Sequence, residues 1–268
     1  MKRNLVMKYD ETLLKFLKNQ QIIVFVETLE HLERAYAESQ RNNNVISMCV
    51  NLPYTSISQI DFNEKWSQIP LLIFAYNIGD YNILFSKINI MRTLDVRIYV
   101  SNDSDTVFTD LKILSSLGID CGLQMKPGIV MDDDSLLDLA SYYYMSPVPH
   151  ATIEPFNYIL KHLTEETSNG FRGVYFEDST LFAHVESFED YEAKEKEEQE
   201  ILKLRLPNYY QHFIDLDNCS KCPAFKICDR NMYDKLKTCQ NTMNEVYEYA
   251  EMQNEIINRN IPKRICQL

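Results

Sequence analysis

Residues 95–125, DVRIYVSNDSDTVFTDLKILSSLGIDCGLQM, hold one complete strand–helix–strand pattern. An apolar run stands at each end, and each run is continuous rather than alternating, which is typical of strands covered on both faces. The apolar residues between them fall on one stripe of a helix: Val107, Leu111 and Leu114. Ser104 or Asp105 is placed to cap the start of this helix, and Gly118 can take the left-handed conformation after its end. The stretch therefore predicts a βα unit whose crossover leads to a parallel strand.

Similar apolar runs precede this unit at intervals of about 25 residues. They are QIIVFVE (21–27), VISMCVN (45–51) and PLLIFAYN (70–77). A second helix pattern, DDDSLLDLASYYY, follows the unit and opens with acidic residues that suit a helix N-terminus. This repetition predicts an α/β fold built on a parallel sheet, which is either open or an incomplete (β/α) barrel.

Polar residues follow the predicted strands, at the carboxyl ends where such folds bind ligands. They are Glu27, Asn51, Asn77, Ser101, Asn102, Asp103 and Lys126. The first six are our candidate peptide- or ligand-binding residues. Each of them is also a common helix-cap or turn residue, and the sequence contains no glycine-rich phosphate-binding loop.

The strand–helix rhythm changes in the second half of the chain. MSPVPHATIEPF (145–156) carries three prolines and is interpreted as a connector across one end of the sheet. His150 and Glu154 lie four residues apart within it and could form an acid–base pair or have structural roles. The segments GFRGVYFED and TLFAHVESF (170–188) predict a hairpin, and a charged helix or linker follows at 189–205. We therefore divide the chain into a (β/α) domain (1–150), a connector with hairpin and charged helix (151–205) and a Cys-rich domain with a helical tail (206–268).

Composition narrows the classes of partner. The 268 residues carry a net charge of −12, which disfavours binding to nucleic acid through its phosphate backbone. The N-terminus has no apolar signal region, and no apolar run reaches transmembrane length. We expect a cytoplasmic protein that does not bind membranes, in which thiols stay reduced.

Four of the seven cysteines lie within 21 residues, in the pattern C-x2-C-x5-C-x10-C. They are Cys219, Cys222, Cys228 and Cys239. Reduced thiols at this density predict a metal or iron–sulfur site, and four thiolates suit either Zn²⁺ or a [4Fe–4S] cluster. The apolar loop PAFKI would shield the site from water, which favours the cluster. Cys266 is an alternative fourth ligand, although Cys239 closes a shorter loop at lower entropic cost.

CSKCPAFKIC (219–228) resembles the core of SPASM domains, the C-terminal auxiliary-cluster domains of radical-SAM enzymes that modify ribosomal peptides. The resemblance implies one auxiliary [4Fe–4S] cluster on the four clustered thiols. It departs from full SPASM domains at Met232, where they carry a further cysteine, and in lacking upstream cysteine partners. DVRIYVSNDSDTVFTDLKILSSLGIDCGL with HATIEPF is similar to barrel segments of Bacteroidales-type peptide maturases of the CXXX-repeat and GG-type systems.

One departure from that family concerns the catalytic centre. Radical-SAM enzymes hold their catalytic cluster with C-x3-C-x2-C after the first strand, and ETLEHLERAYAESQ at this place contains no cysteine. Cys49 and Cys121 are single and far apart in the sequence. We interpret them as small hydrophobic residues buried in the core rather than as cluster ligands. The resemblance therefore implies a pseudo-radical-SAM protein that does not cleave S-adenosylmethionine.

Three functions follow as hypotheses. The first is an iron–sulfur accessory protein in ribosomal peptide maturation, which binds a precursor peptide or a radical-SAM partner. The second is an enzyme that uses the polar cleft at the strand ends, although no catalytic signature supports it. The third is a zinc-stabilised peptide- or protein-binding module.

Overall fold

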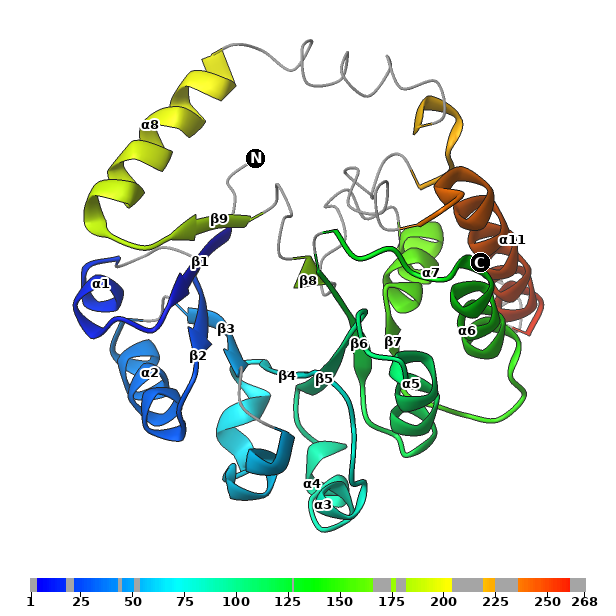
Figure 1. The fold of residues 1–268 in the computed structure, drawn as a ribbon, viewed down its shortest axis with the longest axis horizontal. Helices are drawn as coiled ribbons and strands as arrows, with labels where there is room; N and C mark the ends of the chain where they lie inside the picture. Colours follow the sequence, from blue (N-terminus) through cyan, green and yellow to red (C-terminus); the bar gives the residue numbers. More distant parts are fainter. Residues whose placement is uncertain are drawn as a thin grey trace, which may run out of the picture.

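The computed structural model describes residues 4–17, 22–42, 45–50, 54–126, 128–165, 175–176, 182–203, 219–224 and 236–260. Within them the chain is an α/β protein with a parallel sheet, as the sequence predicted. Six strands follow one another across the sheet in chain order: β1 (Asn4–Lys8), β2 (Ile22–Val26), β3 (Val45–Val50), β4 (Leu71–Ala75), β5 (Val96–Ser101) and β6 (Cys121–Met125). Figure 1 shows the sheet as a curve, with helices along its outer side.

The connections are the helices expected of βα units. They are α1 (Glu11–Phe16), α2 (Leu29–Asn42), the short η1 (Tyr54–Gln59) and η2 (Glu64–Ser67), α3 (Asn82–Phe85), α4 (Ile88–Met91), α5 (Val107–Ser116) and α6 (Asp133–Met145). Gly118 follows α5 with a φ of 76°, which confirms its predicted left-handed conformation. The N-cap of α5 is Thr106 rather than Ser104 or Asp105, and Ser104 Oγ accepts a hydrogen bond from the Thr106 N–H at 3.3 Å.

The two edges of the sheet are completed by later parts of the chain. β7 (Ile153–Glu154) and β8 (Tyr175–Phe176) both pair with β6, while β9 (Phe182–Val185) pairs with β1. The predicted hairpin at 170–188 is therefore wrong. Its two strands pair in parallel with opposite ends of the sheet, because β1 and β6 each offer backbone groups to a further strand. The predicted connector also contributes β7, and β1 was not predicted.

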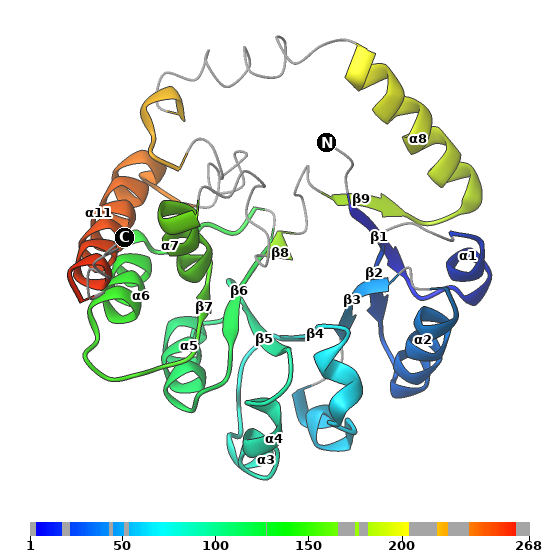
Figure 2. The same ribbon diagram turned by 180° about the vertical axis from the view of Figure 1, so that it is seen from behind.

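The remaining helices lie at the two ends of the curve (Figures 1 and 2). They are α7 (Phe156–Glu165), α8 (Phe188–Lys203), which confirms a helix in the charged segment, and α11 (Cys239–Asn260) in the predicted helical tail. A short turn, η3 (Cys219–Lys221), precedes α11. α11 packs against α6 and α7. None of the helices in the described part of the chain is long and apolar enough to cross a membrane.

Hydrophobic residues cover both faces of the sheet, which explains the continuous apolar runs. One large core contains the residues of β1, β2, β4, β5 and β6 that face the helices. A second, smaller cluster holds residues of alternate position on the same strands: Val6, Ile23, Phe74 and Tyr99. We call the side of the sheet that carries this second cluster the inner face.

Candidate functional site

Charged groups meet at the carboxyl ends of β5 and β6. The Nζ of Lys126 lies 3.1 Å from Oδ2 of Asp103, and Ser101 donates a hydrogen bond to the same carboxylate. Burial alone would raise the pKa of Asp103, but the hydrogen bonds from Ser101 and Lys126 and the charge of Lys126 outweigh it, so this pKa lies below its usual value. Both charged side chains keep about a third of their surface exposed, at 32% and 29%. The Asp103 carboxylate is therefore ionised at neutral pH, and both side chains are within reach of a ligand.

β4 adds an aromatic side chain to this pair. The Tyr76 hydroxyl donates to the backbone oxygen of Asp103 at 3.2 Å, and Lys126 Nζ lies 5.8 Å from the centre of the Tyr76 ring. Tyr76 is 55% exposed. Three neighbouring strands thus supply an aromatic ring, a cation and an anion at one edge, which is a suitable arrangement for a polar or peptide ligand.

Asn102 joins the two loops that carry this edge. Its backbone N–H donates to the oxygen of Gln124 at 3.0 Å, and its Oδ1 accepts from the N–H of Lys126 at 2.9 Å. Its Nδ2 donates to the oxygen of Ile129 at 3.4 Å. Because Asn102 is 7% exposed and bonded on all sides, its role is to hold the loops together rather than to bind a ligand.

The other candidate residues of the strand ends do not join this group. Glu27 is exposed and lies 3.6 Å from Lys8, at the end of the neighbouring strand β1. Asn77 is exposed, and within the described residues no hydrogen bond or ion pair joins it to the Lys126–Asp103 pair. Asn51 lies outside the described residues. The structure thus brings together Ser101, Asn102 and Asp103 out of the six.

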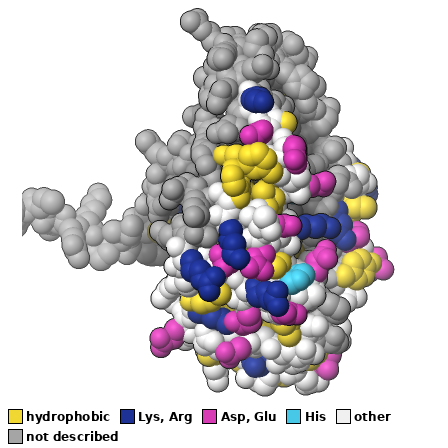
Figure 3. All heavy atoms as spheres, turned by 90° about the vertical axis from the view of Figure 1, so that its left-hand side faces the viewer, with side chains coloured by type: hydrophobic (Ala, Val, Ile, Leu, Met, Phe, Trp, Pro, Cys, Tyr) yellow, Lys and Arg dark blue, Asp and Glu magenta, His cyan; other side chains and the backbone are white. Residues whose placement is uncertain are grey.

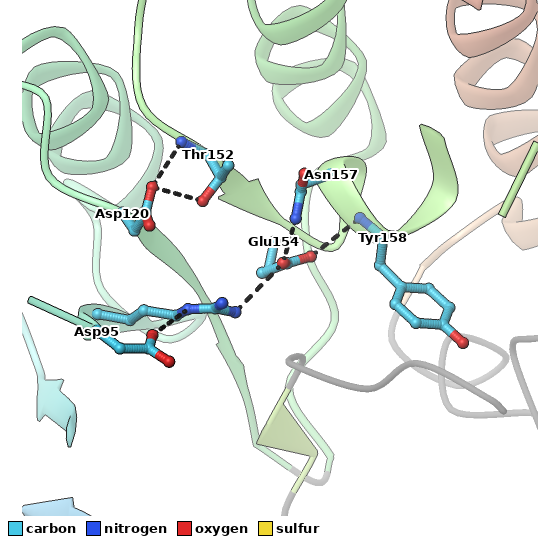
Figure 4. A network of polar contacts seen from close by, with 7 residues as sticks. Asp95, Asp120, Thr152, Glu154, Asn157 and Tyr158 are labelled. Atoms are coloured by element: carbon cyan, nitrogen blue, oxygen red, sulfur yellow. Dashed lines mark hydrogen bonds and ion pairs between the residues drawn. The ribbon is translucent and has the colours of Figure 1, made fainter. Parts of the chain in front are cut away.

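A second polar network lies deeper in the sheet, between β5 and β7 (Figure 4). Glu154 is 2% exposed and accepts hydrogen bonds from Asn157 Nδ2 at 2.7 Å and from the Tyr158 N–H at 3.1 Å. Arg97 Nη1 lies 3.4 Å from the same carboxylate. Burial raises the pKa of Glu154, although the bond from Asn157 and the charge of Arg97 act against it.

This network anchors the start of α7. Glu154 caps the first turn of that helix through Tyr158, and Asp120 accepts two bonds from Thr152, at 3.0 Å from the N–H and 2.7 Å from Oγ1. His150 does not face Glu154, because its ring stacks on Tyr142 with the centroids 5.3 Å apart. These contacts favour structural roles for His150 and Glu154 over an acid–base pair formed by the two side chains.

Aromatic rings also lie on the inner face of the sheet. The rings of Phe25 and Phe74 stack with centroids 5.7 Å apart, and Phe74 lies 5.6 Å from Tyr99. Gly122 faces Tyr99 from the adjacent strand, where a Cβ atom would lie only 2.8 Å from the ring. The absence of a side chain at Gly122 thus leaves room for the Tyr99 ring close to β6.

The Cys segment, which we define as residues 219–239, is described at 219–224 and 236–239. Cys219 and Cys222 lie on one turn, closed by a bond of 3.1 Å from the Cys222 N–H to the Cys219 oxygen. Burial raises the pKa of the Cys222 thiol, a backbone N–H from Ala224 lowers it, and the charge of Cys219 raises it. Cys222 and Cys239 both pack against the large core.

These observations fit the donor chemistry of a thiolate site only in part. The cysteines that the structure describes in this segment have partly buried side chains, and an N–H that points at sulfur, as at Cys222, is a feature of thiolate ligands. Within the described residues, however, no group of three or more His, Cys, Asp or Glu side chains lies close enough to hold a metal ion. Cys228 and Cys266 lie outside them.

The Cys segment is fixed to the sheet through the start of α6. Asp133 accepts bonds from the N–H of Lys237 at 3.0 Å and of Thr238 at 2.8 Å, and from Thr238 Oγ1 at 2.6 Å. Met131 and Leu236 form an isolated parallel bridge beside them. Cys239, one of the candidate metal ligands, therefore follows directly on the residues that contact the end of the loop after β6. Asp133 was seen in the sequence only as an acidic residue at a helix start, since nothing local pairs it with Thr238.

A separate hydrophobic surface lies on the side of the molecule occupied by α1 and α8, where Figure 3 shows yellow side chains gathered among charged ones. Phe16 and Phe188 meet edge to face with ring centroids 4.4 Å apart, yet they are 52% and 39% exposed. Tyr191 packs beside them.

We compared the chain with protein-family models, with curated proteins and with solved structures, and none of the three comparisons gave a match.

Proposed function

We propose that this chain is a pseudo-radical-SAM protein: an incomplete (β/α) barrel that carries a small SPASM-like, iron–sulfur-binding segment. It would serve as an accessory protein in ribosomal peptide maturation and bind a precursor peptide or a radical-SAM partner enzyme. One observation carries the proposal. Six parallel strands follow one another in chain order, and the Cys segment contacts the loop at their carboxyl edge.

The barrel part of the proposal is supported by strand order and curvature. β1 to β6 are parallel neighbours in sequence order, and the helices α1 to α6 lie on the outer side of the curve (Figures 1 and 2). This strand order and curvature support an incomplete (β/α) barrel, a fold in which the carboxyl ends of the strands carry the site. The pairing of β9 with β1 and of β8 with β6 extends the curve from both ends.

The loops after the first two strands support the proposal that this chain does not cleave S-adenosylmethionine. The described β1 is followed by YDETLLKFL and β2 by ETLEHLERAY, and no cysteine precedes Cys49. Three thiolates in one loop are needed to leave one iron open to S-adenosylmethionine. This chain is thus proposed to lack that reaction whichever of the two strands corresponds to the first strand of the family.

The auxiliary site would be held by Cys219, Cys222, Cys228 and Cys239, with Cys266 as the alternative fourth ligand. A [4Fe–4S] cluster there would transfer electrons or stabilise the fold of the C-terminal segment. The packing of Cys222 and Cys239 against the large core gives two of these thiols the exclusion from water that suits such a cluster. Zinc on the same thiolates is the second candidate, and it would make the chain a binding module without a redox role.

The binding role is supported by the carboxyl edge. Tyr76, Lys126 and Asp103 offer an exposed ring and two opposite charges, which together can orient an extended peptide. The net charge of −12 favours a partner segment that carries basic residues.

Metal and sulfide analysis of anaerobically purified protein tests the proposal. We expect about four irons and four sulfides per chain with a brown absorption spectrum. Cys222→Ser should lose most of both. The matched control is Cys121→Ser, because Cys121 is fully buried on the sheet and its thiol contacts the oxygen of Leu111, a contact that a serine hydroxyl can replace.

The other outcomes separate the candidates. One zinc per chain without colour would replace the iron–sulfur function by the zinc-stabilised binding module. Wild-type protein without any metal would refute both. Formation of 5′-deoxyadenosine from S-adenosylmethionine under reducing conditions would contradict the reduced catalytic role.

A further inference from the structure

Aromatic side chains of two helices gather on the side of the molecule shown in Figure 3. Phe16 is the last residue of α1, and Phe188 is the first residue of α8. Their rings pack edge to face, and the centre of the Tyr191 ring lies 6.5 Å from that of Phe16. Phe16 and Phe188 nevertheless stay 52% and 39% exposed. We call these three residues the α1–α8 surface, because exposed aromatic groups that cluster in this way are typical of contact sites between proteins.

The start of α8 is held by side chains that bond to its backbone. Ser187 Oγ accepts the N–H of Asp190 at 3.1 Å, and Asp190 Oδ2 accepts the N–H of Glu186 at 3.0 Å. The Nζ of Lys194 lies 2.8 Å from the same carboxylate. The backbone on both sides of Phe188 is therefore fixed before any partner binds, and such preorganisation lowers the entropic cost of association.

Acidic side chains border the α1–α8 surface. They are Glu186, Glu189 and Glu192, all of them exposed. Glu189 follows Phe188 directly, and Glu192 lies one helical turn beyond Phe188 on the same side of α8. Among the described residues, no ion pair neutralises these three glutamates. Lys15 of α1 and Lys194 in the second turn of α8 are each paired with another carboxylate, so the border keeps a negative charge.

The sign of this charge distinguishes between possible occupants. A second copy of this chain, with its net charge of −12, and an anionic lipid surface would both be repelled. A helix of another protein can pack against a surface that two helices form. An amphipathic helix whose apolar stripe is flanked by lysine and arginine would offer hydrophobic contact to the rings and the opposite charge to the glutamates.

We propose that the α1–α8 surface is a docking site for a basic amphipathic helix of a partner protein. Phe16 and Phe188 are the apolar anchors of this contact, and the surrounding glutamates pair with basic side chains and orient the helix. The inference goes beyond the function proposed above, because it depends neither on the thiol site nor on the carboxyl edge of the sheet.

Fluorescence anisotropy with designed peptides tests this role on the full-length protein. The probe is a fluorescein-labelled helix of roughly 18 residues, or about five turns, with leucine and phenylalanine on one stripe and lysine elsewhere. One control peptide carries glutamate in place of every lysine. A second contains the residues of the probe in scrambled order, which removes the stripe but keeps the charge. We expect the probe to bind at least about tenfold more tightly than either control.

An aromatic substitution locates the bound probe. Phe188→Ala should weaken binding of the probe by about tenfold or more, as the loss of an interface anchor does. Phe85→Ala is the matched control, because Phe85 lies on α3 and is 54% exposed. It should leave the affinity unchanged.

A charge substitution gives an independent readout that does not alter the rings. The double variant Glu189→Gln/Glu192→Gln should bind the probe about threefold or more weakly at low salt, and its affinity should depend less on salt. The control, Glu248→Gln/Glu251→Gln, removes the same charge with the same spacing from exposed positions of α11. It should have a smaller effect on both quantities.

The remaining outcomes would overturn the proposal. They are a wild-type protein that does not prefer the probe to the two control peptides, and an affinity for the probe that Phe188→Ala leaves unchanged. Sedimentation velocity of the wild type alone tests the second copy: a dimer that Phe188→Ala converts to monomer would replace the partner helix by another copy of the chain. Metal analysis decides the function proposed above separately, since none of these measurements needs a metal.

Discussion

Replacing Gly122 by alanine tests the packing of the inner face most directly. A Cβ atom at this position would lie 2.8 Å from Cε1 of Tyr99, which is closer than real Cβ contacts, and 3.0 Å from Cβ of Glu154, which is tighter than most of them. Tyr99 has no exposed surface and Glu154 is 2% exposed, so neither can swing into solvent. Overpacking of this kind costs about 1–3 kcal/mol, and the lower backbone entropy of unfolded alanine returns about 0.5–1 kcal/mol. We expect the balance to be a net loss of up to about 2.5 kcal/mol in the free energy of unfolding.

Urea unfolding followed by the fluorescence of Trp66 measures this change, because Trp66 is the single tryptophan and is fully buried. Gly79→Ala is the control. Its Cβ would meet nothing within 4 Å, so it should stabilise the protein by about 0.4–1 kcal/mol. Adding Tyr99→Leu to Gly122→Ala should recover part of the loss, with a coupling of about 0.5–3 kcal/mol. Neutral surface substitutions change the free energy of unfolding by up to about 0.5 kcal/mol. If the free energies of unfolding of Gly122→Ala and Gly79→Ala differ by less than this, Tyr99 does not pack as closely against β6 as described.

Three further predictions concern buried charge and metal. Asp110 is 3% exposed and accepts hydrogen bonds from a backbone N–H, a tyrosine and a threonine. Asp110→Ala should therefore lower the free energy of unfolding in urea by at least about 2 kcal/mol, whereas the control Asp105→Ala, at an exposed position, should lower it by less than about 0.5 kcal/mol. Burial raises the pKa of Glu154 in the folded state, so the protein should lose stability as the pH rises from the ordinary glutamate pKa through the raised one. Glu154→Gln should remove this part of the pH dependence of stability. If stability depends on pH in the same way in the variant and the wild type, the raised pKa is contradicted. Chelation of bound metal should speed hydrogen exchange in the Cys segment and the first turn of α11 but not in β2 to β5, and uniform acceleration would instead indicate global destabilisation.

The sequence predicted the centre of the sheet because its signals there are local. β2 to β6 coincide with the five apolar runs, and α5, α6 and the turn at Gly118 follow from helix periodicity and glycine conformation. β1 was missed because its five residues, NLVMK, include an asparagine and a lysine and are too short for a clear pattern. β7 was missed because it is two residues long and lies between prolines.

What could not be predicted depends on contacts between distant residues. The pairing of β9 with β1 joins Leu5 to Ala183, and no local pattern names a partner at that separation. The contact of Glu27 with Lys8 likewise depends on β1, which the sequence did not reveal. The cysteine spacing indicates a type of site, whereas the residues that dock the segment can be found only in three dimensions.

The pairing of β1 with β9 also has a consequence for how the protein is made. Asn4 lies opposite Phe182, so β1 leaves the ribosome 178 residues before the strand that covers its outer edge. At about 5–20 residues per second, that edge waits roughly 10–40 s for its partner during synthesis. An uncovered parallel strand is a template for pairing with other chains. Truncations that end before β9 should therefore aggregate, while the same chains extended through Val185 should remain dispersed.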